Sequence, residues 1–395
     1  MNTMQNLALI ITLCLLSSTV YSQSSELYNL DPKQHVKGET YGEVTRFNQV
    51  YFTQEANFGS CNSKCSDYSK PQHNFRESDS YQFDQRTCTG TIHSCNNEER
   101  EDNSHVDNYK VRVPQSSKVD ARYYYVFKQF APKMFQYVYG NIDASNYRTV
   151  TFNSWVRGFV MCAICRCICD EPNDDRSVRS FSLNSLESDT LQNKVITGVQ
   201  IVQQNNVFCL KIHQSCLYAN GKINKNGGSW KSDNPNNNTF NLAFNKHNIH
   251  MGSSILSTAD PKKTREYVVT GVKFADIEGN LALGVKFTLF EISTGKLLPE
   301  QKWVFNSFSK NLLNYHKHGH RPIEYTDNIP TAQTKLGLIQ FEHSHLHDDV
   351  GQSTVPFVDL QPINSNETAL SGVGLHLRGR KSSGGFIAPT LTTYA

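Results

Sequence analysis

The sequence predicts a mainly β protein made of antiparallel hairpin repeats, with either a β-prism-like or a β-sandwich architecture. The first observation is a repeat. VITGVQIVQQNNVFCLKIHQSCLYANGKI at 195–223 resembles VVTGVKFADIEGNLALGVKFTLFEISTGKL at 268–297. Both copies open on Thr-Gly-Val and close on Gly-Lys followed by an aliphatic residue. A shorter copy, LSGVGLHL, begins at Leu370. Three copies of one opening motif favour three related sheets, and a β-sandwich is the main rival.

The second observation is the pattern inside each long copy. An apolar run leads into a polar turn, Gln204-Asn205-Asn206 or Glu278-Gly279-Asn280, and an alternating run follows it. Alternation on both sides of a turn is typical of a β-hairpin. The third observation is that few long helical patterns follow Asp170, so this half is expected to be all β.

The chain divides into four regions by composition. We expect a signal peptide at 1–22, a polar and partly irregular N-terminal region at 23–115, an aromatic segment with a cysteine cluster at 116–170, and a β-rich repeat domain at 171–395. The polar region is short of aliphatic residues and should depend on local disulfides rather than on a core.

The N-terminus predicts export. Residues 7–16 are an apolar run, LALIITLCLL, and small residues follow up to Ser22. This pattern is typical of a secretory signal peptide cleaved after Ser22. The run is far shorter than the roughly 20 residues of a membrane-spanning helix. We therefore expect a secreted, extracellular protein with no membrane span.

Cysteine counting agrees with export. Cys14 lies in the signal peptide, and the ten other cysteines form an even set that predicts disulfides in an oxidising compartment. They are Cys61, Cys65, Cys88, Cys95, Cys162, Cys165, Cys167, Cys169, Cys209 and Cys216. On a strand, Cys165, Cys167 and Cys169 share one face at intervals of roughly 7 Å, which suits separate bridges better than one zinc ion.

Order alone leaves the pairing open. Cys61 with Cys65 and Cys88 with Cys95 are plausible local pairs, and Cys209 and Cys216 are attractive partners for the cluster. Two sequons fit the same route and predict glycosylation at Asn237 and Asn366.

The segment 122–140, RYYYVFKQFAPKMFQYVYG, is rich in aromatic residues. Tyr123, Phe127, Phe130, Met134 and Tyr137 follow helical spacing, whereas Pro132 would break a helix and an alternating pattern is also present. A short helix and a strand both remain open here. The rings themselves are expected to lie in a core.

Two histidine clusters are the candidate metal ligands: His316, His318 and His320, and His343, His345 and His347. Alternate residues of a strand share a face, so adjacent pairs could bind one zinc or copper ion. The competing interpretation is solvated loop histidines, and no cofactor is then expected. A basic stretch at 376–381, HLRGRK, could meet a sulfated glycan or form an ordinary exposed turn.

Several function classes lack support. The formal net charge is +3, from 39 basic and 36 acidic residues, which gives no basis for nucleic-acid binding. Hydrolase, P-loop and Rossmann motifs are missing. No catalytic residue is predicted, and the protein is expected not to be an enzyme.

From about residue 155 to 395 the chain resembles a family of secreted arthropod proteins defined only as a domain of unknown function. The matching motifs include the cysteines at 162–169, NKVITGVQ at 193–200, YVVTGVKF at 267–274, FEISTGKLLPE at 290–300, QSTVPFVDLQPI at 352–363 and LSGVGLHLRGRKSSGGFIAP at 370–389. Residues before about Arg122 match poorly. The resemblance implies export, a high cysteine content and a β-rich body, and it carries no catalytic residues.

The function expected from the sequence is that of a secreted, disulfide-rich, non-enzymatic binding module for glycans or protein partners. The alternative is a secreted metal-binding protein or metal-dependent enzyme that uses the two histidine clusters.

Overall fold

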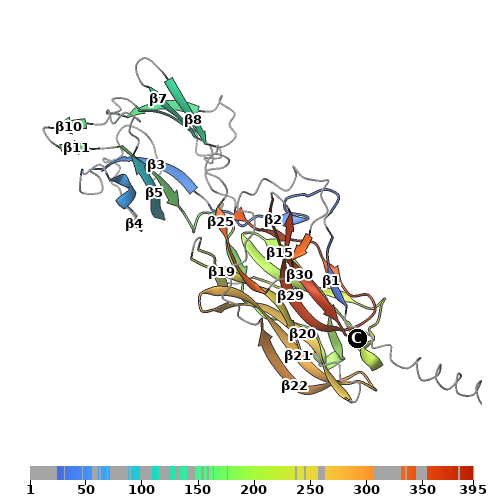
Figure 1. The fold of residues 1–395 in the computed structure, drawn as a ribbon. Helices are drawn as coiled ribbons and strands as arrows, with labels where there is room; N and C mark the ends of the chain where they lie inside the picture. Colours follow the sequence, from blue (N-terminus) through green and yellow to red (C-terminus); the bar gives the residue numbers. More distant parts are fainter. Residues whose placement is uncertain are drawn as a thin grey trace, which may run out of the picture.

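The computed structural model of the chain is mainly β (Figure 1). It describes residues 25–55 except 31 and 47, parts of 61–97, the strands between 109 and 170, residues 171–256 with short gaps, 263–306, parts of 331–343, and 354–394 except 381 and 382. Within these residues, no helix is long and apolar enough to cross a membrane.

Three antiparallel hairpins form the body of the fold. They are β15 (Lys194–Gln204) with β16 (Val207–Cys216), β20 (Arg265–Ile277) with β21 (Asn280–Glu291), and β29 (Leu370–Arg380) with β30 (Ser383–Thr393). The two predicted hairpins are therefore confirmed, and the short third copy of the motif forms a hairpin as well. We call them the first, second and third hairpins.

Each hairpin has the same three neighbours. An outer strand runs antiparallel to the return strand: β17 (Ser229–Ser232), β22 (Lys296–Phe305) and β1 (Glu26–Tyr28), in that order. A short strand runs parallel to the start of the return strand: β13 (Ser180–Ser182), β19 (Asn248–Ile255) and β27 (Phe357–Asp359). That short strand pairs on its other side with β18 (Thr239–Asn241), β24 (Gly337–Gln340) or β2 (Tyr41–Gly42).

The three units are linked in a ring. Beyond the short strand that runs parallel to one hairpin, the chain continues to the first strand of another hairpin and pairs with it. The crossing strands are β14 (Leu186–Glu187) onto β20, the second half of β19 onto β29, and β28 (Ile363–Asn364) onto β15. These crossings connect the first hairpin to the second, the second to the third and the third to the first.

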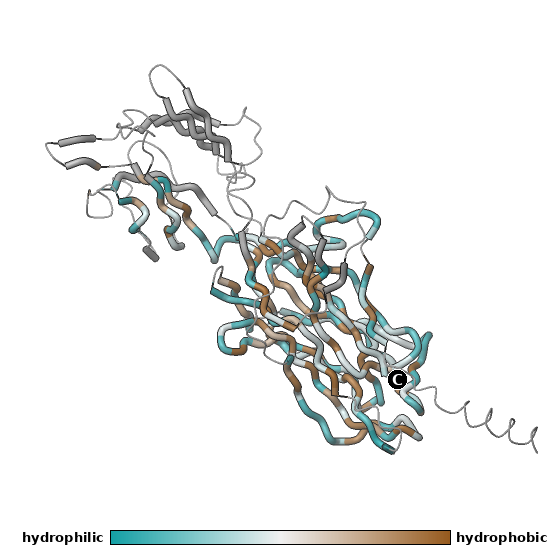
Figure 2. Tube along the Cα trace, in the orientation of Figure 1, coloured by the Kyte–Doolittle hydropathy of each residue, from teal (hydrophilic) through white to brown (hydrophobic). Residues whose placement is uncertain are grey.

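The three hairpins share one hydrophobic core. Val199, Val272 and Val373, which follow the glycine of each repeated motif, are all buried in it. Val195, Val268 and Ala369, two residues before each Thr or Ser, meet in a second and smaller cluster. Figure 2 shows apolar residues along these strands and hydrophilic residues at many of the turns. Equivalent residues therefore come together in space, as internal repeats around a common axis require.

The repeated motif marks a β-bulge in every hairpin. The strand register shifts at Thr197, Thr270 and Ser371, each of which is buried. A bulge leaves one residue unpaired and bends the strand. The next residue is glycine because the crossing strand lies close. A Cβ at Gly198 would come within 2.7 Å of the Ile363 carbonyl oxygen.

The cysteine cluster forms the centre of a separate four-stranded sheet. β12 (Ile164–Asp170) lies between β3 (Asn48–Gln54) and β5 (Thr91–Asn97), and β4 (Lys70–Pro71) pairs with β5. Four disulfides join this region: Cys61 to Cys162, Cys65 to Cys165, Cys88 to Cys169 and Cys95 to Cys167. The prediction of separate bridges from one strand face is confirmed, whereas the local pairs Cys61 with Cys65 and Cys88 with Cys95 are wrong.

The helical interpretation of the aromatic segment is wrong. β7 (Tyr124–Gln129) and β8 (Met134–Tyr139) form an antiparallel pair in a four-stranded sheet, ordered β8-β7-β6-β9. The other members are β6 (Tyr109–Pro114) and β9 (Tyr147–Phe152). Runs of aromatic and β-branched residues favour strands, and Pro132 falls between the two strands rather than inside either. β10 (Trp155–Arg157) and β11 (Val160–Cys162) pair nearby in the sequence.

The N-terminal region contributes to both parts of the fold. β1 and β2 belong to the third hairpin unit, so Figure 1 shows the N-terminal strand β1 in blue beside the C-terminal strands in red. β3, β4 and β5 instead join the cysteine strand. The remaining short elements are β23 (Thr331–Gln333), β25 (Glu342–His343), β26 (Thr354–Val355), and the 3-10 turns η2 (Cys65–Asp67), η5 (Thr190–Gln192) and η6 (Ala219–Gly221).

Candidate binding pocket

A pocket of about 430 Å³ lies on the outer face of the third hairpin. Its lining comes from four strands, β1, β19, β29 and β30, and from Leu336 just before β24. Its volume falls within the range of about 300 to 1,000 Å³ that is usual for small-ligand sites. Several polar groups converge on this pocket.

The strands beneath the pocket carry several small residues. Ser253 pairs with Gly374, which pairs with Thr390, and in the next such row Ile255 pairs with Gly372, which pairs with Thr392. Directly opposed residues point to the same face of a sheet. Two glycines therefore stand in the middle of the outer face, between residues that line the pocket.

The rim of the pocket is apolar on one side. Leu336 and Ile255 both line it, and they are 54% and 50% exposed. Leu336 lies over Gly252: a Cβ atom added to this glycine would be only 2.4 Å from Leu336 Cδ2. Exposed apolar side chains that lie together mark a ligand or partner site more often than apolar side chains scattered singly over the surface.

The other side of the pocket is polar. Glu26 lies on the N-terminal strand and is exposed. The Thr390 hydroxyl lies 3.2 Å from Glu26 Oε1 and 3.0 Å from the Leu27 carbonyl oxygen, so it can donate to either. Ser253 and Thr392 add two more side-chain hydroxyls to the lining. The pocket therefore offers one carboxylate acceptor and several groups that both donate and accept.

His376 lies at the buried side of the pocket and is 2% exposed. Burial lowers the pKa of His376 to about 4, the Arg378 charge adds to the effect, and the Ala388 backbone opposes it. The imidazole is consequently neutral at pH 7, with one donor and one acceptor nitrogen.

A buried ion pair lies next to His376 on the same strand face. Arg378 Nη1 is 2.6 Å from Asp359 Oδ2, and the two side chains are 2% and 0% exposed. The same nitrogen donates to the Asn29 carbonyl oxygen, and the guanidinium lies over the Phe386 ring. Burial raises the pKa of the Asp359 carboxyl, which Arg378 opposes.

His376 and Arg378 therefore do not belong to the exposed basic patch or turn that was expected at 376–381. His376 and Arg378 are buried because the segment at 25–46 packs over the outer face of the third hairpin. Within it, His35 stacks on Phe386, with ring centroids 4.9 Å apart, and Tyr41 packs edge-on against Phe357. The pocket is the part of this face that the segment leaves open.

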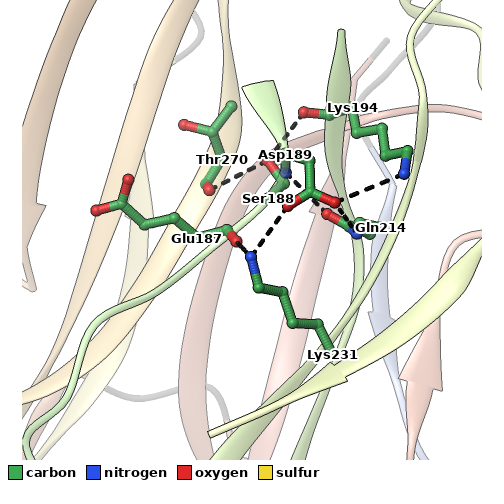
Figure 3. Close-up of polar contacts among 7 residues, drawn as sticks. All are labelled: Glu187, Ser188, Asp189, Lys194, Gln214, Lys231 and Thr270. Atoms are coloured by element: carbon green, nitrogen blue, oxygen red, sulfur yellow. Dashed lines mark hydrogen bonds and ion pairs between the residues drawn. The ribbon is translucent and has the colours of Figure 1, made fainter. Parts of the chain in front are cut away.

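A second polar cluster surrounds Asp189, and its contacts are structural (Figure 3). Its carboxylate accepts from Gln214 Nε2 at 2.7 Å and from Lys231 Nζ at 3.1 Å, while the Asp189 backbone NH donates to Gln214 Oε1. These bonds, that from Gln214 first, lower the pKa of Asp189. The Ser188 hydroxyl donates to the Lys194 carbonyl oxygen, and the Ser188 backbone NH donates to the Thr270 carbonyl oxygen. The cluster fixes the crossing segment between the first and second hairpins.

Cys209 and Cys216 are free thiols, which corrects their predicted bridges to the cluster. The cluster cysteines pair with 61–95 instead, while Cys209 and Cys216 lie on β16 in another sheet. Seven residues separate them along one strand, so they point to opposite faces and cannot pair with each other. Burial, with help from Asp233, raises the pKa of the Cys209 thiol to about 12.

The described residues do not test the predicted metal ligands. His316, His318, His320, His345 and His347 lie outside the described residues, and of His343 only the backbone, in β25, is described. Cys88, Cys169 and Glu171 do converge, but the two sulfurs are joined in a disulfide and are not thiolate ligands. Asn366 is exposed at a bend before β29, as its glycosylation would require, and Asn237 lies outside the described residues.

Sequence reasoning missed the pocket. Its residues come from 26, 252–255, 336, 375–376 and 390–392, and no local motif joins these positions. One signal was present: Gly372, Gly374, His376 and Arg378 occupy alternate positions, so they share one face of a strand whose other face is aliphatic. A strand with glycines on one face offers a surface on which something else can pack.

The fold defines a mainly β, disulfide-rich protein with a pocket on one hairpin face. The chain belongs to the family described as "Domain of unknown function (DUF4803)", which matches residues 8–212, just over half of the 395 residues. The match overlaps the region of expected resemblance at 155–212 and includes residues before Arg122, which were expected to match poorly. No curated protein matches the chain.

Proposed function

We propose that this chain is a secreted, non-enzymatic binding protein, and that the pocket on the third hairpin binds a glycan. The observation that carries the proposal is the combination of a 430 Å³ hollow, an exposed carboxylate, three hydroxyl groups and an apolar rim. Sugars present hydroxyl donors and acceptors together with apolar C–H faces, and such a surface matches both.

Secretion is supported by two independent features. The apolar run at 7–16 with small residues before Gln23 is typical of a signal peptide. Four disulfides connect 61–95 with 162–169, and such bridges persist in oxidising compartments. The family match adds no activity, since its description names none.

Binding is favoured over hydrolysis by the chemistry of the lining. Glycoside hydrolysis ordinarily uses two carboxyl groups on either side of the bond that breaks. The pocket lining that the structure describes contributes one, Glu26. Its neighbour Thr390 is a hydrogen-bond donor and not a general acid.

The experiment is a glycan array probed with the full-length secreted protein, with and without EDTA. Binding to a defined set of glycans that survives the chelator supports the proposal. Failure to bind any glycan, with correct folding shown by circular dichroism, would overturn it.

Metal binding by the two histidine clusters is a second candidate, favoured by their alternate spacing in the sequence. Elemental analysis of the purified protein tests it. Zinc or copper at about one ion per chain, lost when His343, His345 and His347 are replaced by alanine, is the expected result. Absence of bound metal after dialysis against zinc and copper contradicts it.

A further inference from the structure

The second hairpin shows what occupies the equivalent outer face there. The Phe305 ring lies over Gly284: a Cβ atom added to this glycine would be 2.6 Å from the ring. The Trp303 ring lies near Gly271, and a Cβ atom added there would be 3.3 Å from it. Lys273 Nζ is 4.6 Å from the Trp303 ring centroid and 5.6 Å from that of Phe305. Glycines in the sheet thus let aromatic rings of the chain itself pack closely on the backbone.

The strand register makes the three outer faces comparable. In the second hairpin, Gly271 after the bulge pairs with Lys286, which pairs with Trp303 on the outer strand. In the first hairpin, the same path leads from Gly198 through His213 to Trp230.

In the third hairpin the path leads from Gly372 through Thr392 to Glu26. Two residues further along the outer strand, Tyr28 takes the place that Phe305 has in the second hairpin. Two of the three units therefore place a tryptophan at this position, and the third places a carboxylate beside an open pocket.

We propose that the pocket holds one uncharged sugar ring of a glycan, seated beside Gly372 where the Trp303 ring sits in the second hairpin. This inference rests on the proposed function and names its ligand class. In the second hairpin the Trp303 ring lies near Gly271, the glycine that follows the bulge, so the geometry of that unit accepts a ring beside this glycine. At this register the third hairpin has Glu26 where the other two hairpins have a tryptophan ring.

The charge of the pocket selects a neutral ring. Glu26 accepts hydrogen bonds from sugar hydroxyls, and a bond to an ionised group is stronger than a neutral one. The same carboxylate repels a sulfate or carboxylate on the ligand. Thr392 and Ser253 complete the polar contacts, while Leu336 and Ile255 face the apolar side of the ring.

The test is calorimetric titration of the full-length protein with neutral, sulfated and sialylated oligosaccharides of equal length. Glu26→Trp gives the third hairpin the residue that the other two carry, so the variant is expected to fold. It should fill the pocket and weaken binding of the neutral sugar by about 100-fold or more. Glu26→Gln keeps the shape and should weaken the neutral sugar by about tenfold while reducing discrimination against sulfated sugars.

The matched control is Tyr218→Trp, which adds an exposed tryptophan outside the pocket lining and should leave affinity unchanged. Equal binding by the wild-type protein and Glu26→Trp, with thermal unfolding showing both folded, overturns the inference and leaves glycan binding elsewhere intact. Preference for sulfated over neutral sugars also overturns it. If the wild-type protein binds none of the three classes, the proposed function itself fails.

Discussion

Arg378 on β29 and Asp359 on β27 form an ion pair whose two side chains are both buried. Asp359→Leu removes the buried carboxylate that lies 2.6 Å from Arg378 Nη1. Removing one partner of a buried pair costs about 3 to 5 kcal/mol of unfolding free energy. We expect a loss of this size in urea unfolding monitored by circular dichroism.

The double variant Arg378→Met with Asp359→Leu should recover much of that loss, since no unpaired charge remains. Lys225→Met is the surface control, because Lys225 and Glu367 form an exposed ion pair and its loss should not be measurable. A destabilisation by Asp359→Leu no larger than that of Lys225→Met would contradict the buried pair.

His376 links stability to pH. Its pKa is about 4 in the folded chain and 6.5 in the unfolded chain, so between these values the unfolded chain binds more protons. Stability contributed by the neutral imidazole is complete above pH 6.5 and is lost as pH falls toward 4. The shift corresponds to about 3 kcal/mol.

Urea unfolding at pH 7 and pH 4.5 measures this linkage. The wild-type protein should lose more unfolding free energy between these pH values than His376→Gln does, because glutamine does not titrate. Equal losses in the two proteins would mean that His376 is solvated and not buried beside the pocket.

The two free thiols give a direct chemical readout. Maleimide labelling of the native protein should modify Cys216, which is half-buried, well before Cys209, whose thiol is buried with a raised pKa. After denaturation without reduction, both should label and the four bridged pairs should not. Peptide mass spectrometry that finds Cys209 or Cys216 in a disulfide would contradict their assignment as free thiols.

At the scale of elements, the Thr-Gly-Val motif could be recognised from the sequence, while its physical meaning could not. The motif predicts a hairpin, and the bulge and crossing strand become visible only when strands distant in sequence are paired. The hydroxyls of the second hairpin illustrate this, because Thr270 Oγ1 lies 2.6 Å from Thr288 Oγ1 and both are fully buried.

Thr270→Val tests the bulge by removing one hydroxyl at nearly constant volume. The Thr288 hydroxyl then loses its partner, and the expected cost is about 1 to 3 kcal/mol. Thr270→Val with Thr288→Val should be less destabilised than the single variant, since no buried hydroxyl is left unsatisfied. Additive losses in urea unfolding would show that the two hydroxyls do not interact.

The cysteine strand could also be predicted in part. Alternate cysteines on β12 indicate bridges from one face, and this is confirmed. Their partners could not be derived, because Cys61, Cys65, Cys88 and Cys95 reach the strand through pairings over separations of 72 to 101 residues. Local spacing carries no information about such contacts.

At the scale of the whole molecule, the closed ring of three units depends on contacts between the two ends of the chain. Glu26 pairs with Thr392 across 366 residues, and Tyr41 with Asp359. The sequence shows two long repeats and a fragment of a third because the third unit takes its outer strand from the N-terminus. Its pocket was unpredictable for the same reason, since Glu26 reaches it only through this closure.

A crystal structure of the protein soaked with the neutral oligosaccharide that binds best tests the central claim most directly. We expect electron density for one sugar ring beside Gly372, with a hydroxyl of that ring within hydrogen-bond distance of Glu26. A sugar ring bound at any other surface, with the pocket on the third hairpin empty, would contradict the account.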